Sequence, residues 1–341
     1  MSNRLPVAII GAGYWGKNLI RVFNAFPGAE IRVVCDTNEQ RLIPVRLQYP
    51  HVALTKNADE IFSNSEIEAV LIATPPAAHF DLARRALDCG KHVWIEKPMA
   101  STVVEAEQLA RIAREKNRVL LVDHTFLYTA AVRKMKEIID RDELGTLRFL
   151  DSERINLGLI QPDVNVVYDL AAHDLSIFNY LTGTAPVSVH AFGASHVTRG
   201  SSNPREEIAY IGLRYPGDIL GHVRVSWLSP VKIRKMLVGG SQKMLVFNDI
   251  EPTEKIRVYD HGVEIDFGQD TATDPVYRSG DVVIPRIDNN EALYDEAQHF
   301  AECIREGKEP LTSAKDGIAV MKVLEAANRS LRNNGEMIEI V

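Results

Sequence analysis

The sequence lacks the features that mark several large classes of protein. Only three of its 341 residues are cysteine, and Cys35, Cys89 and Cys303 are too scattered for a disulfide framework or a zinc site. It has no apolar run of about 18 residues that would predict a transmembrane helix, and no charged-then-apolar leader. The formal net charge is −7, which argues against nucleic acid or an anionic membrane as a partner. These absences favour a cytoplasmic protein.

What is present is the composition of a globular protein, with 45% hydrophobic and 25% charged residues. The length exceeds what one hydrophobic core usually supports, so two domains are expected. No H-x-x-x-H pair and no cluster of carboxylates predicts a metal site.

The first part of the chain alternates short apolar runs with amphipathic stretches. Strands are expected at Val7–Ile10, Ile31–Cys35, Ala69–Ala73, His92–Ile95 and Val119–Asp123, with helices at Tyr14–Phe26, Glu39–Gln48, Ala77–Asp88 and Val103–Glu115 between them. Such alternation is typical of a doubly wound parallel sheet. We therefore expect a Rossmann domain over residues 1–124.

The pattern then changes to long alternating strands. They are expected at Leu147–Ile155, Val187–Val197, Glu207–Tyr215, Ile219–Leu228, Lys235–Val238, Lys243–Asn248 and Lys255–Tyr259, with helices at Ala130–Arg141, Val167–Thr182, Asn290–Arg305 and Ala314–Asn333. This predicts a second, α+β domain over residues 125–341, with a large open and mainly antiparallel sheet. The last helices are free to pack back on the first domain.

One face of such a sheet is available for contact with a second subunit. Ile219, Val223, Val225 and Trp227 are expected to keep that face apolar. An apolar sheet face needs a cover, so we expect a homodimer or homotetramer built by sheet-to-sheet contact.

The clearest motif is G-x-G-x-x-G at Gly11, Gly13 and Gly16, directly after the strand Val7–Ile10. The first glycine permits the tight turn, the second lets backbone approach a pyrophosphate, and the third lets the helix pack closely on the sheet. An acid, Asp36, ends the next strand and would accept hydrogen bonds from the adenosine ribose. The alternative is a glycine-rich turn without a ligand. The whole strand–helix–strand–acid order predicts a dinucleotide site.

The acid also bears on which dinucleotide binds. A carboxylate at Asp36 repels a 2′-phosphate, and Arg41 lies five residues further on. NAD is therefore the expected coenzyme and NADP the less favoured one.

The second motif is Glu96-Lys97-Pro98, directly after the strand His92–Ile95. Carboxyl ends of strands face the ligand crevice in a doubly wound sheet, so Lys97 is expected to point at the coenzyme. A surface loop lysine is the alternative reading.

A third pattern is Asp169-Leu-Ala-Ala-His173. Residues four apart share one face of a helix, so both side chains can address one substrate hydroxyl. Histidine suits the removal of a hydroxyl proton near neutral pH. A packed histidine without catalytic work is the alternative.

In the order and spacing of five motifs the whole chain resembles the Gfo/Idh/MocA family of sugar oxidoreductases. The motifs are GAGYWG (11–16), IATPPAAH (72–79), EKP (96–98), DLAAHD (169–174) and the tail EPLTSAKDGIAV…EAANRS (309–330). The resemblance implies a nicotinamide coenzyme and chemistry at a sugar or cyclitol carbinol. It implies catalytic roles for Lys97, Asp169 and His173, with His173 as the base. It also implies a coenzyme site that includes Tyr14, Trp15, Thr74, Pro75, His79, Glu96 and Lys97.

The substrate is less well defined. The segment from Arg154 to Gly158 resembles that of members in nucleotide-sugar pathways, which predicts C3 of a UDP-N-acetylhexosamine, with substrate contacts from Arg154, Asn156 and His124. Arg154 could equally be a surface strand residue. Because Asp169 is more typical of members that act on free cyclitols, inositol or a simple aldose is the alternative substrate.

Two other classes of function stay open. One is a hydrolase that uses bound NAD for transient oxidation of a glycoside, and the other is an NAD-sensing protein without catalysis. The presence of Lys97, Asp169 and His173 together counts against the second.

Overall fold

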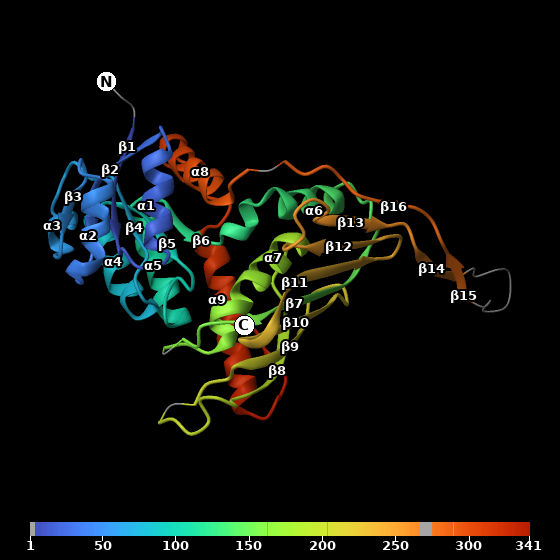
Figure 1. Ribbon diagram of the computed structural model, residues 1–341. Helices are drawn as coiled ribbons and strands as arrows, with labels where there is room; N and C mark the ends of the chain where they lie inside the picture. Colours follow the sequence, from blue (N-terminus) through green and yellow to red (C-terminus); the bar gives the residue numbers. More distant parts are fainter. Residues whose placement is uncertain (1–3, 162, 203, 266–274, 289) are drawn as a thin grey trace. The chain divides into compact units, whose positions relative to one another are not determined.

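The chain forms two compact units, which Figure 1 shows as ribbons. This computed structural model describes residues 4–161, 163–202, 204–265, 275–288 and 290–341. The first unit contains Met1–Tyr128 and Asn290–Met321, and the second contains Thr129–Asn289 and Lys322–Val341. The chain therefore leaves the first unit after Tyr128 and returns to it near the C-terminus.

The first unit is built on a six-stranded parallel sheet in the order β3-β2-β1-β4-β5-β6. Its strands are β1 Leu5–Ile10, β2 Ala29–Cys35, β3 Ala53–Thr55, β4 Ala69–Ile72, β5 His92–Glu96 and β6 Leu120–Asp123. Its helices are α1 Gly16–Ala25, α2 Glu39–Gln48, α3 Asp59–Phe62, α4 His79–Asp88, α5 Val103–Glu115 and α8 Ala292–Glu306, with 3₁₀ turns η1 Pro76–Ala78 and η2 Thr125–Tyr128. The strand order reverses beside β1, as in doubly wound sheets. The predicted Rossmann fold is confirmed.

Aromatic packing in this unit ties a late segment of the chain to an early one. Trp94 on β5 meets Phe23 of α1 edge to face at 5.5 Å and Phe300 of α8 at 5.6 Å. All three side chains are buried. Helix α8 thus completes the hydrophobic core of the first unit.

The second unit is built on a nine-stranded sheet in the order β16-β13-β12-β11-β7-β10-β9-β8-β17. The strands are β7 Leu147–Leu157, β8 Ser188–Ala194, β9 Ile208–Arg214, β10 Leu220–Ser226, β11 Leu228–Gly240, β12 Met244–Asn248, β13 Ile256–Tyr259, β16 Val282–Val283 and β17 Ile338–Glu339. Strands β14 Gly262–Ile265 and β15 Pro275–Arg278 pair separately. Among the described strands of this sheet, only β7 and β10 pair in parallel, so the sheet is mainly antiparallel, as predicted.

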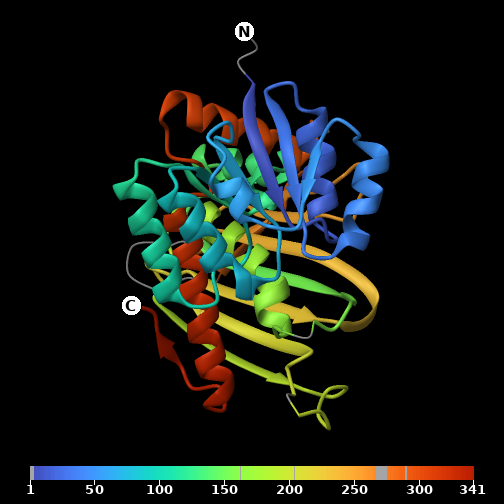
Figure 2. The ribbon, with the colours of Figure 1, turned by 90° about the vertical axis from the view of Figure 1, so that its left-hand side faces the viewer.

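Helices cover one face of this sheet, as Figures 1 and 2 show. They are α6 Ala130–Asp140, the π-helix η3 Val167–Ala171, α7 Ala172–Thr182 and the second half of α9 Ala314–Arg332. The helix predicted at 167–182 is therefore two helices of different geometry. It ends at Gly183, where a φ of +73° stops the helix in the left-handed region.

The residues predicted to make the open face of the sheet apolar lie on its covered face instead. Val223, Val225 and Trp227 are at most 1% exposed and lie under the helices. In strand β10 the alternate residues point outward, and these include His222 and Arg224. Alternation along a strand separates two faces but does not say which of them is covered.

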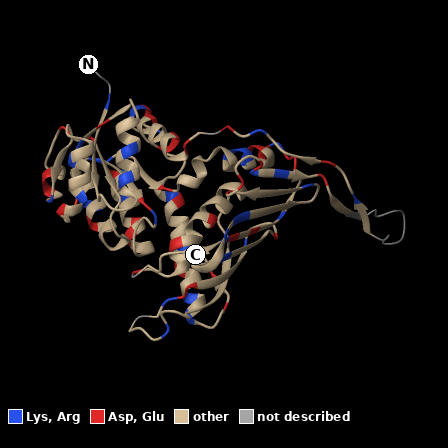
Figure 3. Cartoon of the chain, in the orientation of Figure 1, with Lys and Arg blue, Asp and Glu red and all other residues tan. Residues whose placement is uncertain are grey.

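Charge is distributed evenly over the elements of both units. Figure 3 shows Lys and Arg interspersed with Asp and Glu along the described helices and strands. None of the described helices combines the length and the apolar character that crossing a bilayer requires.

Candidate active site

The glycine-rich turn after β1 has the geometry that its spacing predicts. A Cβ on Gly11 would lie 2.4 Å from the carbonyl oxygen of Ala73, and a Cβ on Gly16 only 1.9 Å from that of Gly11. Gly11 also has a φ of +103°, which other residues rarely adopt. A Cβ on Gly13 would meet only the Arg41 side chain, at 3.8 Å. The turn is thus closed against the sheet and open at Gly13, where a pyrophosphate would approach the backbone.

Asp36 holds this turn to the end of β2. Its carboxylate accepts hydrogen bonds from the backbone N–H groups of Ala12 and Asn38, both at 2.8 Å. Arg41 Nη1 lies 3.6 Å from the same carboxylate, and Asp36 is only 5% exposed. The negative charge therefore lies beside the turn, where it favours a ribose over a 2′-phosphate, with Arg41 as a partial counter-charge.

His79 holds two loops of the site together. Its Nδ1 lies 2.8 Å from the Pro98 carbonyl oxygen and its Nε2 2.8 Å from that of Thr74, and burial lowers the pKa of the imidazole. The side chain has no exposed surface. The resemblance implied that His79 lines the coenzyme, but here it braces the loops that carry Thr74 and Lys97. Pro75, which directly follows Thr74, is exposed.

A pair of carboxyl groups lies at the carboxyl ends of β5 and β6. Glu96 and Asp123 face each other in register, and burial, reinforced by the Asp123 charge, raises the pKa of Glu96 well above its usual range. Burial thus favours the protonated form of Glu96, in which the carboxyl group donates to Asp123. Asp123 also accepts from Trp15 Nε1 at 2.9 Å and from Thr125 N–H at 3.1 Å.

This pair fixes Trp15 of the glycine-rich turn against β6. Asp123 was not among the site residues predicted from the sequence. An acid at the carboxyl end of a strand next to the one that carries Glu96 could have indicated it. Tyr14, the other aromatic residue in the turn, is 89% exposed.

Several polar atoms at these strand ends have no hydrogen-bond partner among the described residues. They are Thr74 Oγ1, Glu96 Oε1 and both ring nitrogens of His124, all buried. Burial lowers the pKa of His124 to about 4, so its ring is neutral and carries one donor and one acceptor. Buried polar atoms rarely stay unsatisfied, so this row of atoms fits a polar ligand such as a nicotinamide nucleotide. Lys97 follows Glu96 directly and is joined to Pro98 by a cis peptide bond.

In the second unit, Asp169 lies in the π-helix η3 and His173 in the first turn of α7. Trp227 Nε1 donates to Asp169 Oδ2 at 3.0 Å, and Trp227 is 1% exposed. Both Asp169 and His173 are half-buried. A buried indole thus orients the carboxylate, which sequence reasoning did not foresee because it had assigned Trp227 to the open face.

Arg154 is not available to a substrate. It is 4% exposed, its Nε donates to Asp174 Oδ2 at 2.7 Å, and its Nη2 donates to Asp174 Oδ1 at 3.2 Å. Ser152 Oγ also donates to Asp174, at 2.6 Å. This buried set joins α7 to β7. The expected contact between Arg154 and a substrate diphosphate is therefore corrected, while Asn156 stays half-buried two positions further along the strand.

Two family models match the chain. The model described as "Oxidoreductase family, NAD-binding Rossmann fold" matches residues 5–124, and the model of the GFO/IDH/MocA C-terminal domain matches residues 132–246. The chain belongs to the Gfo/Idh/MocA family of oxidoreductases. The predicted NAD-binding domain is thereby confirmed.

Curated relatives of this family member span nearly all of its length. It is 26% identical to a UDP-N-acetylglucosamine 3-dehydrogenase of Acidithiobacillus ferrooxidans, with 95% of each chain covered. It is also 26% identical to a scyllo-inositol 2-dehydrogenase (NAD(+)) of Bacillus subtilis, with 98% of this chain and 96% of that one covered.

Solved structures share the fold. A levoglucosan dehydrogenase in complex with NADH and levoglucosan has a TM-score of 0.84 at 21% identity, with 99% of each chain covered. GenD2 from gentamicin A biosynthesis, in complex with NAD, has a TM-score of 0.83 at 22% identity, with 100% of this chain and 97% of that one covered.

Proposed function

We propose that this chain is an NAD-dependent dehydrogenase that oxidises a CH–OH group of a sugar or cyclitol. The observation that carries the proposal is the hydrogen bond from buried Trp227 to Asp169, four residues before His173. A buried donor that orients a half-buried carboxylate is the kind of support that holds a functional group in place at a binding or catalytic site. The family and the row of polar atoms beside Glu96 support the coenzyme half of the proposal.

The roles follow from the chemistry of the side chains. NAD, when bound, supplies the hydride acceptor. His173 takes the hydroxyl proton, because an alcohol is far too weak an acid to lose it unaided. Lys97 donates a hydrogen bond to the same oxygen as negative charge develops on it. Asp169 orients the hydroxyl or the imidazole.

For the substrate, a free cyclitol or aldose is the better supported class. Arg154, the residue that favoured a diphosphate, is buried, and its guanidinium is paired with the Asp174 carboxylate. Asp169 is an acceptor that suits uncharged hydroxyl groups. The second candidate is oxidation at C3 of a UDP-N-acetylhexosamine, which the similarity to a UDP-N-acetylglucosamine 3-dehydrogenase favours.

The direct test measures NADH formation by purified protein with inositols, free aldoses and UDP-N-acetylhexosamines. We expect NADH with at least one uncharged polyol. His173→Ala should lower turnover by about two to four orders of magnitude while NAD affinity is kept. Lys97→Ala should also lower it sharply, and the double variant should lose less than the product of the two, since both residues act on one oxygen.

The same experiment separates the other classes. Glycoside cleavage without net NADH would indicate the NAD-dependent hydrolase. NAD binding without turnover of any substrate in the panel, or full activity in His173→Ala, would contradict the proposed mechanism.

A further inference from the structure

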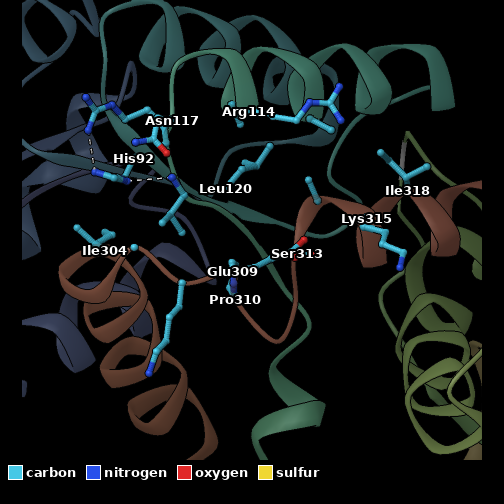
Figure 4. Close-up of a pocket in the computed structure, with 17 residues that line it drawn as sticks. His92, Arg114, Asn117, Leu120, Ile304, Glu309, Pro310, Ser313, Lys315 and Ile318 are labelled. Carbon is cyan, nitrogen blue, oxygen red and sulfur yellow. Dashed lines mark hydrogen bonds between the residues drawn. The ribbon is translucent and has the colours of Figure 1, made fainter.

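The first unit has a hollow where strands β5 and β6 begin, away from the glycine-rich turn. Its volume is about 740 Å³, and it is lined by the first residue of β5, the first residue of β6, the end of α5 and the segment from Gly307 to Ile318 (Figure 4). Coenzyme residues such as Gly11 and Lys97 follow the carboxyl ends of their strands, whereas His92 begins β5. Parallel strands place these two ends at opposite edges of the sheet. The hollow is therefore separate from the coenzyme site.

The lining of this hollow is cationic, although the chain as a whole is acidic. Its lining residues include four basic side chains, Arg114, Arg118, Lys308 and Lys315, and one carboxylate, Glu309; Lys308 is also paired with Glu306 beside the hollow. In Figure 4, His92 and Asn117 lie on one side of the hollow and Lys315 on the other. The charge at this place favours an anionic ligand.

Apolar side chains complete the lining. They come from α5, β6, α8, the segment before α9 and α9 itself, and they are Ala110, Ala113, Leu120, Ile304, Pro310 and Ile318. A site that combines such a surface with a few polar groups is typical of pockets for small organic molecules.

The contacts of His92 place two donors side by side, with no acceptor for them among the described residues. His92 Nδ1 accepts from the Val119 N–H at 3.0 Å, so the proton of the neutral ring is on Nε2. Burial, with a further contribution from Arg118, lowers the pKa of His92 to about 4, so the ring is neutral at physiological pH. Arg118 Nη1 lies 3.2 Å from this same Nε2. Both groups are donors, and in this exposed contact an oxygen of water or of a ligand that lies beside both of them would accept from each.

We propose that this hollow binds a small organic anion, whose phosphoryl or carboxylate oxygen accepts hydrogen bonds from His92 Nε2 and Arg118 while its apolar part packs on the Ala110, Leu120 and Ile318 side of the lining. An oxyanion satisfies both donors at once, and the guanidinium fork suits its geometry. The remaining basic side chains add long-range attraction.

Calorimetric titration of the NAD-loaded protein tests this site. The probes are phenyl phosphate, benzoate and inorganic phosphate, at an ionic strength held constant with chloride. Bound NAD fills the coenzyme site, so saturable binding reports a different one. We expect phenyl phosphate or benzoate to bind at one site per chain. The probe that binds more tightly shows whether the site prefers a phosphoryl or a carboxylate group. We also expect phenyl phosphate to bind more tightly than inorganic phosphate.

Two variants with the same change of charge locate the site. Arg118→Gln should weaken the binding of the preferred probe about tenfold, the worth of one charge-assisted hydrogen bond. Arg111, on α5 before the connection that carries Arg118, lies outside the hollow and is paired with Glu115, so Arg111→Gln should leave the binding unchanged. Absence of saturable binding for every probe, or equal weakening by both variants, would overturn the proposal. So would inorganic phosphate binding as tightly as phenyl phosphate, since the apolar lining would then contribute nothing. None of these readouts depends on dehydrogenase activity.

Discussion

Two carboxyl groups in this protein are prepared in opposite ways. Burial and the neighbouring Asp123 raise the pKa of Glu96 and favour its protonated form, which is a donor. Asp169 is an acceptor, since the indole N–H of Trp227 donates to it. Each role follows from the immediate surroundings of the carboxyl group, and each can be tested by replacing one side chain.

Trp227→Phe should lower kcat about tenfold or more, because the loss of a buried hydrogen bond to a charged group frees Asp169 to rotate. NAD affinity should stay as it is, and the pH profile of kcat should change along with kcat, as expected for a residue that positions an acid near the base. Steady-state kinetics over a range of pH measures both.

Trp94→Phe is the matched control, since Trp94 is equally buried but its indole nitrogen has no partner among the described residues. If both variants lose stability alike and neither changes the pH profile, then Trp227 only fills space.

Glu96→Gln should change how stability depends on pH. The amide keeps a donor toward Asp123 but cannot ionise. The folded-state pKa of Glu96 is raised above its unfolded value, so the wild-type contribution is fully present at low pH and is lost as pH rises through the folded pKa. The free energy of unfolding of the variant, relative to wild type, should therefore rise from mildly acidic to alkaline buffer. Urea titrations across that range measure it, and parallel curves would contradict the protonated state.

At this scale the sequence predicted residue types better than residue partners. The glycines, Asp36 and Glu96 were identified because a short local motif dictates their surroundings. Arg154 was assigned to the substrate and Trp227 to the open face because their partners, Asp174 and Asp169, are close only after folding. Periodicity contains no information on such contacts.

Among the elements, the βαβ units were predictable because their apolar runs are continuous and their helices amphipathic. The π-helix at Val167–Ala171 was not, since one added residue per turn leaves the apolar pattern nearly helical. Two-residue strands such as β16 and β17 exist only through their neighbours β13 and β8, so no local signal marks them. Strand β11, predicted at 235–238, extends from Leu228 to Gly240 because β7 pairs along it.

The link between helix α7 and strand β7 gives a prediction at this scale. Arg154→Met should lower the free energy of unfolding by about 3–5 kcal/mol, because it leaves the Asp174 charge buried without its partner. Arg154→Met combined with Asp174→Leu should recover a large part of that loss, since both charges are then gone. Chemical denaturation measures all three proteins.

The kinetics of the folded Arg154→Met variant decide between the two roles of this residue. If Arg154 has only a structural role, the substitution should change KM for a UDP-sugar no more than KM for a free sugar. A selective rise of KM for the UDP-sugar would instead support the contact between Arg154 and a diphosphate that the sequence indicated.

On the scale of the whole molecule, the open face of the large sheet carries a row of stacked side chains. Phe192 stacks on Tyr210 at 5.2 Å, Tyr210 on His222 at 6.4 Å, and the Arg224 guanidinium lies 5.6 Å from the Tyr210 ring centre. Phe192 remains 57% exposed. Aromatic and arginine side chains in such a row are enriched in protein interfaces.

We therefore still predict that the protein associates with itself. The contact would involve the aromatic row of the open face and not Val223 and Val225. We expect light scattering to give a homodimer or homotetramer. Phe192→Glu should shift it toward monomer, because two like charges would meet, or be buried, at a two-fold contact between sheets. Leu47→Glu, on α2 of the first unit and 79% exposed, has the same change of charge and should leave the mass unchanged. A monomeric wild type, or equal dissociation by both variants, would show that the open face stays in water and that its aromatic row stabilises only the sheet that carries it.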